Sequence, residues 1–174
     1  MKTKVVQVLP YDPLWAVEFE RLKTFLMQVC GNSILAIHHV GSTSVWGLAA
    51  KPILDIDLVI RPGQFELLKS RLASVGYRHE GDLGIEGREA FKYEVTSFMA
   101  HHLYALYPDA AELARHLAFR EHLRTHPQDR EAYGLVKHNA ALAHPLDIEG
   151  YMEDKNDIIQ AIYRKIESKL SKKE

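Results

Sequence analysis

Apolar residues near the start of the chain recur every three or four positions, which is the spacing of side chains on one face of an α-helix. Asp12 and Pro13 are residue types that favour the first positions of a helix, and Gly31 favours its end. The sequence therefore predicts a helix over residues 13–30. Its apolar face is formed by Trp15, Phe19, Leu22, Leu26 and Val29.

Shorter apolar and β-branched runs predict strands. These runs cover residues 33–40, 53–60 and 77–80, and residues 5–9 are predicted to form a short strand or an extended arm. Residues 90–96 and 98–106 alternate as an antiparallel pair that turns at Ser97. Helices are predicted between and after the strands by apolar spacing and by proline and glycine positions. They comprise a single turn at 45–50 and longer helices at 64–75, 109–125, 127–142 and 148–170.

This order of elements predicts an α+β fold. We expect a small mixed sheet, with helices on one side of it and at its C-terminal end. A length of 174 residues is typical of one domain. We therefore predict a single domain over residues 1–174, with a sheet half over about 1–107, a helical half over about 108–174 and no flexible linker between them.

Composition narrows the classes of partner. Hydrophobic residues make up 47% of the chain and the formal net charge is −1, so no overall field would attract nucleic acid or an anionic membrane. We expect neither as a partner.

There is no apolar run of ~18 residues and no signal-peptide pattern at the start, so the cytoplasm is the expected location. Cys30 is the only cysteine, which excludes an internal disulfide.

Two carboxylates stand out in the predicted strand at residues 53–60. Asp55 and Asp57 are two positions apart, so their side chains point to the same face. Two neighbouring negative charges repel, and folding them together costs free energy unless a cation neutralises them. Oxygen ligands of this kind suit a hard divalent ion such as Mg²⁺. Twelve residues separate Asp55 from Ser42, which follows Gly41 in a small-residue turn.

A glycine–serine turn, a spacer and an Asp-hydrophobic-Asp strand resemble the signature of the nucleotidyltransferase superfamily. The string from His38 to Ser44 with the following Gly-Leu-Ala-Ala-Lys-Pro at 47–52 resembles one branch of it, the GrpB family. Further matching segments extend the resemblance over about residues 5–165. They are Pro10 to Pro13, His101 to Tyr104, Phe119 with Arg120, Leu123 to Pro127, Leu135 to Lys137, and Tyr151 with Lys155.

The resemblance implies a nucleotidyltransferase-like fold and a set of site residues. Gly41, Ser42, Thr43 and Ser44 would hold the phosphates of a nucleoside triphosphate, and Lys51 would reach them as a point charge. Asp55 and Asp57 would hold Mg²⁺ or Mn²⁺. Three cations of the helical half would line the cleft opposite the aspartates: Arg120, Lys137 and Lys155.

One feature departs from the superfamily pattern. Active members carry a further acid on a neighbouring strand, but the matching segment here, residues 100–106, contains none. Glu94 on the preceding strand is one alternative. His101 or His102 is another, as metal ligand or as base, because imidazole can serve in both roles near neutral pH. Alternation places one of these two histidines in the core and the other in the cleft.

Three functions remain open on this sequence. The first is a metal-dependent nucleotidyltransferase with an unknown acceptor. The second is a catalytically inactive nucleotide- or cofactor-binding protein. The resembled family occurs fused to dephospho-coenzyme A kinase, which implies an accessory role in coenzyme A synthesis for this second alternative. The third is a protein-interaction module with an inactive site.

Overall fold

The computed structural model describes residues 5–171. The five strands of this part of the chain are β1 (Ile34–Val40), β2 (Leu54–Ile60), β3 (Tyr77–Gly81), β4 (Arg88–Tyr93) and β5 (His101–Leu106). The α-helices are α1 (Leu14–Cys30), α2 (Phe65–Ala73), α3 (Ala111–Thr125), α4 (Pro127–Ala143) and α5 (Ile148–Leu170). Two short 3₁₀ turns, η1 (Gly31–Ser33) and η2 (Ser42–Ser44), precede and follow β1.

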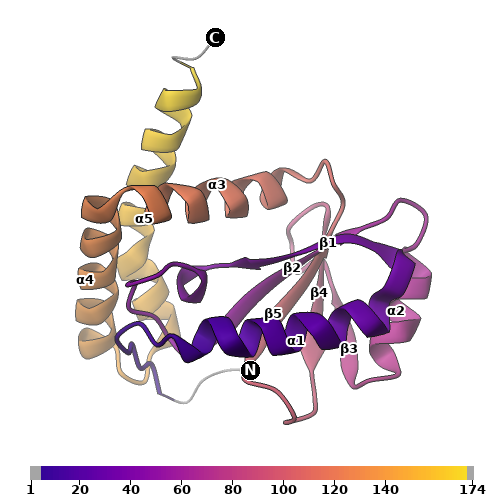
Figure 1. Cartoon of the computed structure of the whole chain (residues 1–174). Coiled ribbons are helices and arrows are strands. Elements are labelled where there is room, and N and C mark those ends of the chain that lie inside the picture. The colour runs from indigo at the N-terminus through magenta and orange to yellow at the C-terminus, as the bar shows by residue number, and fades with distance from the viewer. Residues whose placement is uncertain (1–4, 172–174) are drawn as a thin grey trace.

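The strands form one sheet in the order β1-β2-β5-β4-β3 (Figure 1). Strands β2 and β5 are parallel, and the other neighbours are antiparallel. The predicted α+β class and mixed sheet are therefore confirmed. The parallel register places Asp55 beside His102 and Asp57 beside Tyr104 on β5. On the other side of β2, the antiparallel register places Asp55 beside Val40 and Asp57 beside His38.

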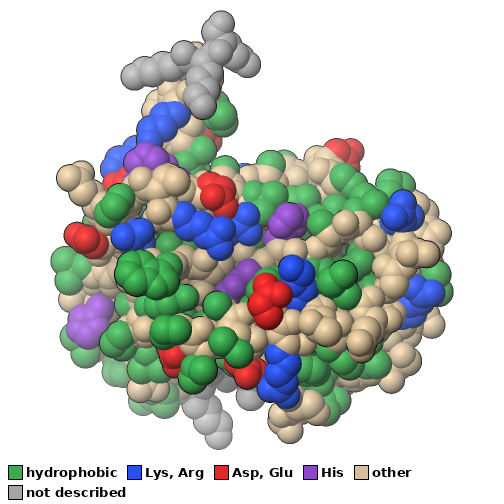
Figure 2. Space-filling view, in the orientation of Figure 1, with side chains coloured by type: hydrophobic (Ala, Val, Ile, Leu, Met, Phe, Trp, Pro, Cys, Tyr) green, Lys and Arg blue, Asp and Glu red, His purple; other side chains and the backbone are tan. Residues whose placement is uncertain are grey.

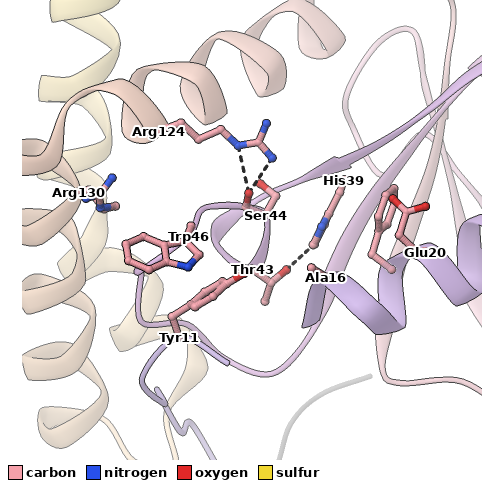
Figure 3. A pocket seen from close by; sticks show the side chains of 10 residues that line it. Tyr11, Ala16, Glu20, His39, Thr43, Ser44, Trp46, Arg124 and Arg130 are labelled. Carbon is pink, nitrogen blue, oxygen red and sulfur yellow. Dashed lines mark hydrogen bonds between the residues drawn. The ribbon is translucent and has the colours of Figure 1, made fainter. Parts of the chain in front are cut away.

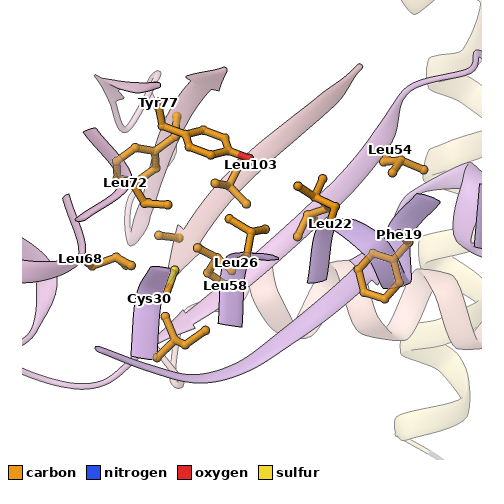
Figure 4. Packing of buried hydrophobic residues seen from close by; sticks show 14 of the residues in the cluster. Phe19, Leu22, Leu26, Cys30, Leu54, Leu58, Leu68, Leu72, Tyr77 and Leu103 are labelled. Carbon is orange, nitrogen blue, oxygen red and sulfur yellow. The ribbon is translucent and has the colours of Figure 1, made fainter. Parts of the chain in front are cut away.

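Alternation along β2 separates a core face from a polar face. Leu54, Ile56, Leu58 and Ile60 are fully buried and pack against α1 and α2 in the main core (Figure 4). Asp55, Asp57 and Val59 point the other way. This second face is covered in part by α3, whose Leu113 packs against Val59 and Leu106. The expectation of helices on one side of the sheet was thus wrong, because apolar positions on the second face also require cover.

Helices α4 and α5 pack against each other at the end of the sheet near β1 and α3 (Figure 1). The segment after η2 enters this helical end. Its Val45 and Leu48 are buried with Leu123 of α3, Tyr133 of α4 and Ile162 of α5. These contacts fix the η2 turn between the sheet and the helices.

Several predicted elements differ from the structure in position. The helical turn expected at residues 45–50 occurs earlier, as η2. Residues 5–9 form only a single bridge, between Leu9 and Ala50. Strands β4 and β5 pair as expected, but β4 ends before the turn, at Tyr93, and β5 begins after it, at His101. In the segment between them, the Arg21 guanidinium donates to the Ser97 carbonyl at 2.8 Å.

Candidate functional site

The Asp55 carboxylate lies at the open edge of the polar face. Its Oδ1 is 2.9 Å from Nδ1 of His102, and both side chains are partly exposed. The contact follows from the register, because parallel neighbours at paired positions project their side chains to the same face. Of the two histidines on β5, His102 is therefore the one beside the aspartates.

His101 lies on the opposite face of the sheet. Its Nε2 is 2.7 Å from the Tyr77 hydroxyl, and its Nδ1 is 2.7 Å from the Met99 carbonyl oxygen. It pairs in register with the buried Leu54, which explains its direction. The prediction that His101 joins Asp55 and Asp57 at a metal is wrong on this geometry. Glu94 is also remote, because it is exposed and paired with Arg78 at 3.0 Å.

Asp57 is completely buried and is held by α3. Its Oδ2 is 2.7 Å from Nδ1 of His116, and the Nε2 of that imidazole is 3.1 Å from Oε1 of Glu112. Glu112 and His116 are four residues apart, so they share one helix face. The other oxygen of Asp57, Oδ1, is buried and has no hydrogen-bond partner among the described residues.

The charge state of His116 follows from this arrangement. A neutral imidazole has one N–H, whereas two acceptor carboxylates face this ring, so the doubly protonated form satisfies both. Burial lowers the pKa of His116, but the hydrogen bond to Asp57 and the charges of Asp57, Glu112 and Asp55 outweigh it and raise the pKa overall. The raised pKa thus favours positive charge on His116 beside Asp57. The sequence analysis missed both Glu112 and His116.

The Gly41 turn lies directly against Asp55. Gly41 has a φ of 69°, and a Cβ on it would stand 2.2 Å from Asp55 Oδ2. The turn is closed by the Ser44 hydroxyl, which donates to the Gly41 carbonyl at 2.6 Å. Only glycine permits this approach, so the turn lies in direct contact with the Asp55 carboxylate.

Three lysines surround the turn and Asp55 and are here called the lysine cluster: Lys51, Lys137 and Lys155. Lys137 is buried and donates to the Ser42 hydroxyl at 2.8 Å. Lys155 is also buried, and its ammonium group lies over the Tyr151 ring, 4.4 Å from the centroid. Lys51 approaches the same ring at 5.4 Å. Within residues 5–171, none of the three ammonium groups lies within 4.0 Å of a carboxylate oxygen.

Burial disfavours charge on this cluster. It lowers the pKa of Lys137 well below its usual value, and the nearby charge of Lys155 lowers it further. Burial, together with the charge of Lys51, lowers the pKa of Lys155 to about 8. The negative charge of Asp55 raises the pKa of all three lysines, but by less than burial lowers it. Buried ammonium groups of this kind become favourable when an anion binds beside them.

Other predicted phosphate ligands point elsewhere. Thr43 is buried, with its hydroxyl 2.9 Å from Nε2 of His39, and the Ser44 hydroxyl is used within the turn. Their hydroxyl groups are therefore already used within the protein. Arg120 donates to the His39 carbonyl at 2.9 Å and to Glu121 at 2.8 Å. Its contacts hold α3 to β1, and it does not contact the aspartates.

The donor atoms at Asp55 and Asp57 suit a cation in part. Carboxylate oxygens are ligands for Mg²⁺ or Mn²⁺, and the unpartnered Asp57 Oδ1 is the kind of atom that a cation would satisfy. However, no group of three or more His, Cys, Asp and Glu side chains in the described chain is arranged to hold a metal ion. The two aspartates fit an ion only if water or ligand oxygens complete its coordination.

The sequence profile of a family described as GrpB protein matches residues 5–165. The chain belongs to the GrpB family. Among relatives, the UPF0157 protein YqkA of Bacillus subtilis (strain 168) is 35% identical over 159 residues, which cover 89% of this chain and 45% of YqkA. The chain thus spans less than half the length of that relative.

Two solved structures resemble this chain in fold. The crystal structure of conserved protein GrpB from Enterococcus faecalis superposes with a TM-score of 0.83 at 34% identity, covering 94% of this chain and 99% of that one. The structure of Cid1 in complex with its short product ApU gives a TM-score of 0.56 at 11% identity, covering 76% of this chain and 42% of Cid1. The second likeness concerns the fold alone, which is nucleotidyltransferase-like as predicted. No helix within residues 5–171 is long and apolar enough to cross a membrane.

Proposed function

We propose that this GrpB-family protein binds the phosphates of a nucleoside triphosphate in the cleft between the Gly41–Ser42 turn, the aspartates and the lysine cluster. The supporting observation is the pair of buried lysines, Lys137 and Lys155, that have no carboxylate partner in residues 5–171. Keeping two ammonium groups buried without a salt-bridge partner costs stability. An anion at Ser42 and Lys137 would offset that cost.

A divalent cation is the second part of the proposal. Asp55 and Asp57 would hold Mg²⁺ or Mn²⁺ together with oxygens from the phosphates and water. The bound ion would neutralise charge on the phosphates and polarise the phosphorus. The protein's own side chains would orient the triphosphate, Lys137 through its contact with Ser42, and Lys155 and Lys51 as nearby charges.

Nucleotidyl transfer is the reaction that this arrangement best supports. His102 is partly exposed beside Asp55 and is the candidate to accept the proton of an acceptor hydroxyl. A binding protein without transfer is the alternative, as sensor or as accessory protein in coenzyme A synthesis. It is favoured by one observation: β5 presents an imidazole beside Asp55, where a further carboxylate is absent.

Thermal unfolding with ATP and Mn²⁺ tests the binding. We expect the stability of wild type to rise with the logarithm of ligand concentration above the dissociation constant, as for any ligand that binds only the folded state. Asp57→Asn should lose the metal-dependent part of the stabilisation. Equal stabilisation of both proteins would contradict the metal site. Pyrophosphate release in the presence of trial acceptors would support transfer over binding alone.

A further inference from the structure

A second hollow lies on the other side of the η2 turn. Its volume is about 500 Å³, within the ~300–1,000 Å³ range of small-molecule sites. Arg124 from α3, Arg130 from α4, and Ala16 and Glu20 from α1 surround it, with Tyr11 and Trp46 along its lower side (Figure 3). It does not include Asp55 or Asp57. His39 in its wall pairs with the core residue Ile56, which places the hollow on the opposite side of β1 and β2 from the aspartates.

One wall of the hollow is aromatic. The Trp46 side chain remains 73% exposed, whereas the other tryptophan, Trp15, is 3% exposed. Tyr11 lies beside Trp46, with ring centroids 6.3 Å apart, and is anchored by an edge-to-face contact with Trp15 at 5.5 Å. An exposed indole next to a held phenol leaves a large apolar surface in water. A planar ring that stacked there would remove that surface from solvent.

Two guanidinium groups lie above and beside the aromatic side chains (Figure 3). Arg124 donates from Nε and Nη2 to the Ser44 carbonyl at 3.1 and 2.8 Å, which fixes its position. Glu121 offsets part of its charge at 3.2 Å. Arg130 forms one long hydrogen bond, to the Leu123 carbonyl at 3.4 Å, and no salt bridge within the described chain. On this face Lys and Arg side chains gather next to hydrophobic ones below α3 (Figure 2). Guanidinium groups held in this way bind phosphate oxygens through paired N–H donors.

The remaining polar groups set the character of the ligand. Burial lowers the pKa of His39 to about 4, so this residue is neutral near pH 7 and adds no competing charge. Glu20 lies on the α1 side, away from Arg130 (Figure 3). Its carboxylate can accept a hydrogen bond from an amino group. The hollow thus offers an aromatic surface, cations on one side and an acceptor on the other.

We propose that this hollow is a second ligand site, for a nucleoside monophosphate whose base carries an amino group. The base would stack on Trp46 beside Tyr11. The phosphate would bind Arg130 and the outward N–H groups of Arg124. This site is separate from the triphosphate cleft, and the η2 turn forms a wall shared by the two.

The experiment uses AMP as the probe and the fluorescence of Trp46 as one signal. We expect saturable quenching by AMP, with an affinity that calorimetry reproduces. Trp46→Leu and Arg130→Met should each weaken AMP binding at least tenfold. Both should keep the wild-type thermal unfolding midpoint, because Trp46 is mostly exposed and Arg130 makes only one long hydrogen bond. Lys137→Met, which alters only the cleft, should leave AMP affinity unchanged.

Two results would overturn this inference. One is the absence of saturable AMP binding to wild type. In the other, Lys137→Met abolishes AMP binding, whereas Trp46→Leu and Arg130→Met leave it intact. AMP would then occupy the triphosphate site. The second result would still agree with the proposed function. If wild type and all three variants fail to bind the triphosphate while wild type still binds AMP, only the proposed function is contradicted.

Discussion

Single residues decide the geometry of the cleft, and Gly41 is the clearest case. Its positive φ of 69° and the 2.2 Å gap between a Cβ and Asp55 Oδ2 both exclude other residues. We expect Gly41→Ala to lower the free energy of unfolding by ~2 kcal/mol or more, from backbone strain plus displacement of Asp55. Urea unfolding measures this change. Gly63→Ala is the control, because Gly63 has a φ of 79° and nothing within 4 Å, so it reports strain alone. Equal losses in the two variants would contradict the contact.

Lys155 predicts a pH dependence. Its pKa of about 8 in the folded protein lies below the usual 10.5, so the folded state binds fewer protons than the unfolded state between these values. Stability should therefore rise as pH increases from about 8 to 10.5, and the cost of burying this charge is fully present below pH 8. Lys155→Met should raise the unfolding temperature of the ligand-free protein at pH 7 by ~2–4 °C per kcal/mol gained, and by less at pH 10. Calorimetric scans at both pH values test this, and a destabilised variant at pH 7 would contradict it.

At the scale of elements, α3 completes the site by crossing the polar face of the sheet. His116→Ala should leave Asp57 buried and unpaired, at a cost of ~3–5 kcal/mol. The folded pKa of His116 is raised, so its contribution is fully present below its unfolded pKa of 6.5 and is lost as pH rises through the folded value. Denaturant unfolding at pH 6 measures the loss, and His138→Ala on the exposed side of α4 is the control.

A double-mutant cycle tests the coupling of His116 to Asp57. Adding Asp57→Asn to His116→Ala should recover part of the loss. Additive effects would contradict the coupling.

The sequence predicted most elements because their signals are local. Residues 13–30 have both helical spacing and end signals, and β2 has a continuous apolar run interrupted only by the aspartates. The position of α3 has no such signal, since 59 positions separate Asp57 from His116. The Glu112–His116 spacing of four was the one available sign, but it is equally common on solvated helices. The hydroxyls of Thr43 and Ser44 bond to His39 and Gly41, which the motif could not reveal because it does not say which side of a turn each hydroxyl faces.

At the scale of the whole molecule, one site combines charges from both halves of the chain. The sheet half supplies the Gly41 turn and the aspartates, and the helical half supplies His116, Lys137 and Lys155. Sequence could name the lysines only through a family resemblance. Their burial depends on α4 and α5 packing against the segment after η2, which is a tertiary effect. Cations from one half facing acids from the other are what a bound triphosphate with a metal ion would require.

Calorimetric titration of a non-hydrolysable ATP analogue with Mg²⁺ tests this account most directly. Wild type should bind, and Lys137→Met should weaken the affinity at least tenfold, because the ammonium group at Ser42 is lost. Arg164→Met, an exposed cation on α5, is the matched control and should bind as wild type does. Circular dichroism verifies that the variant is folded. If the folded Lys137→Met variant binds the analogue as tightly as wild type does, the proposed phosphate site is contradicted.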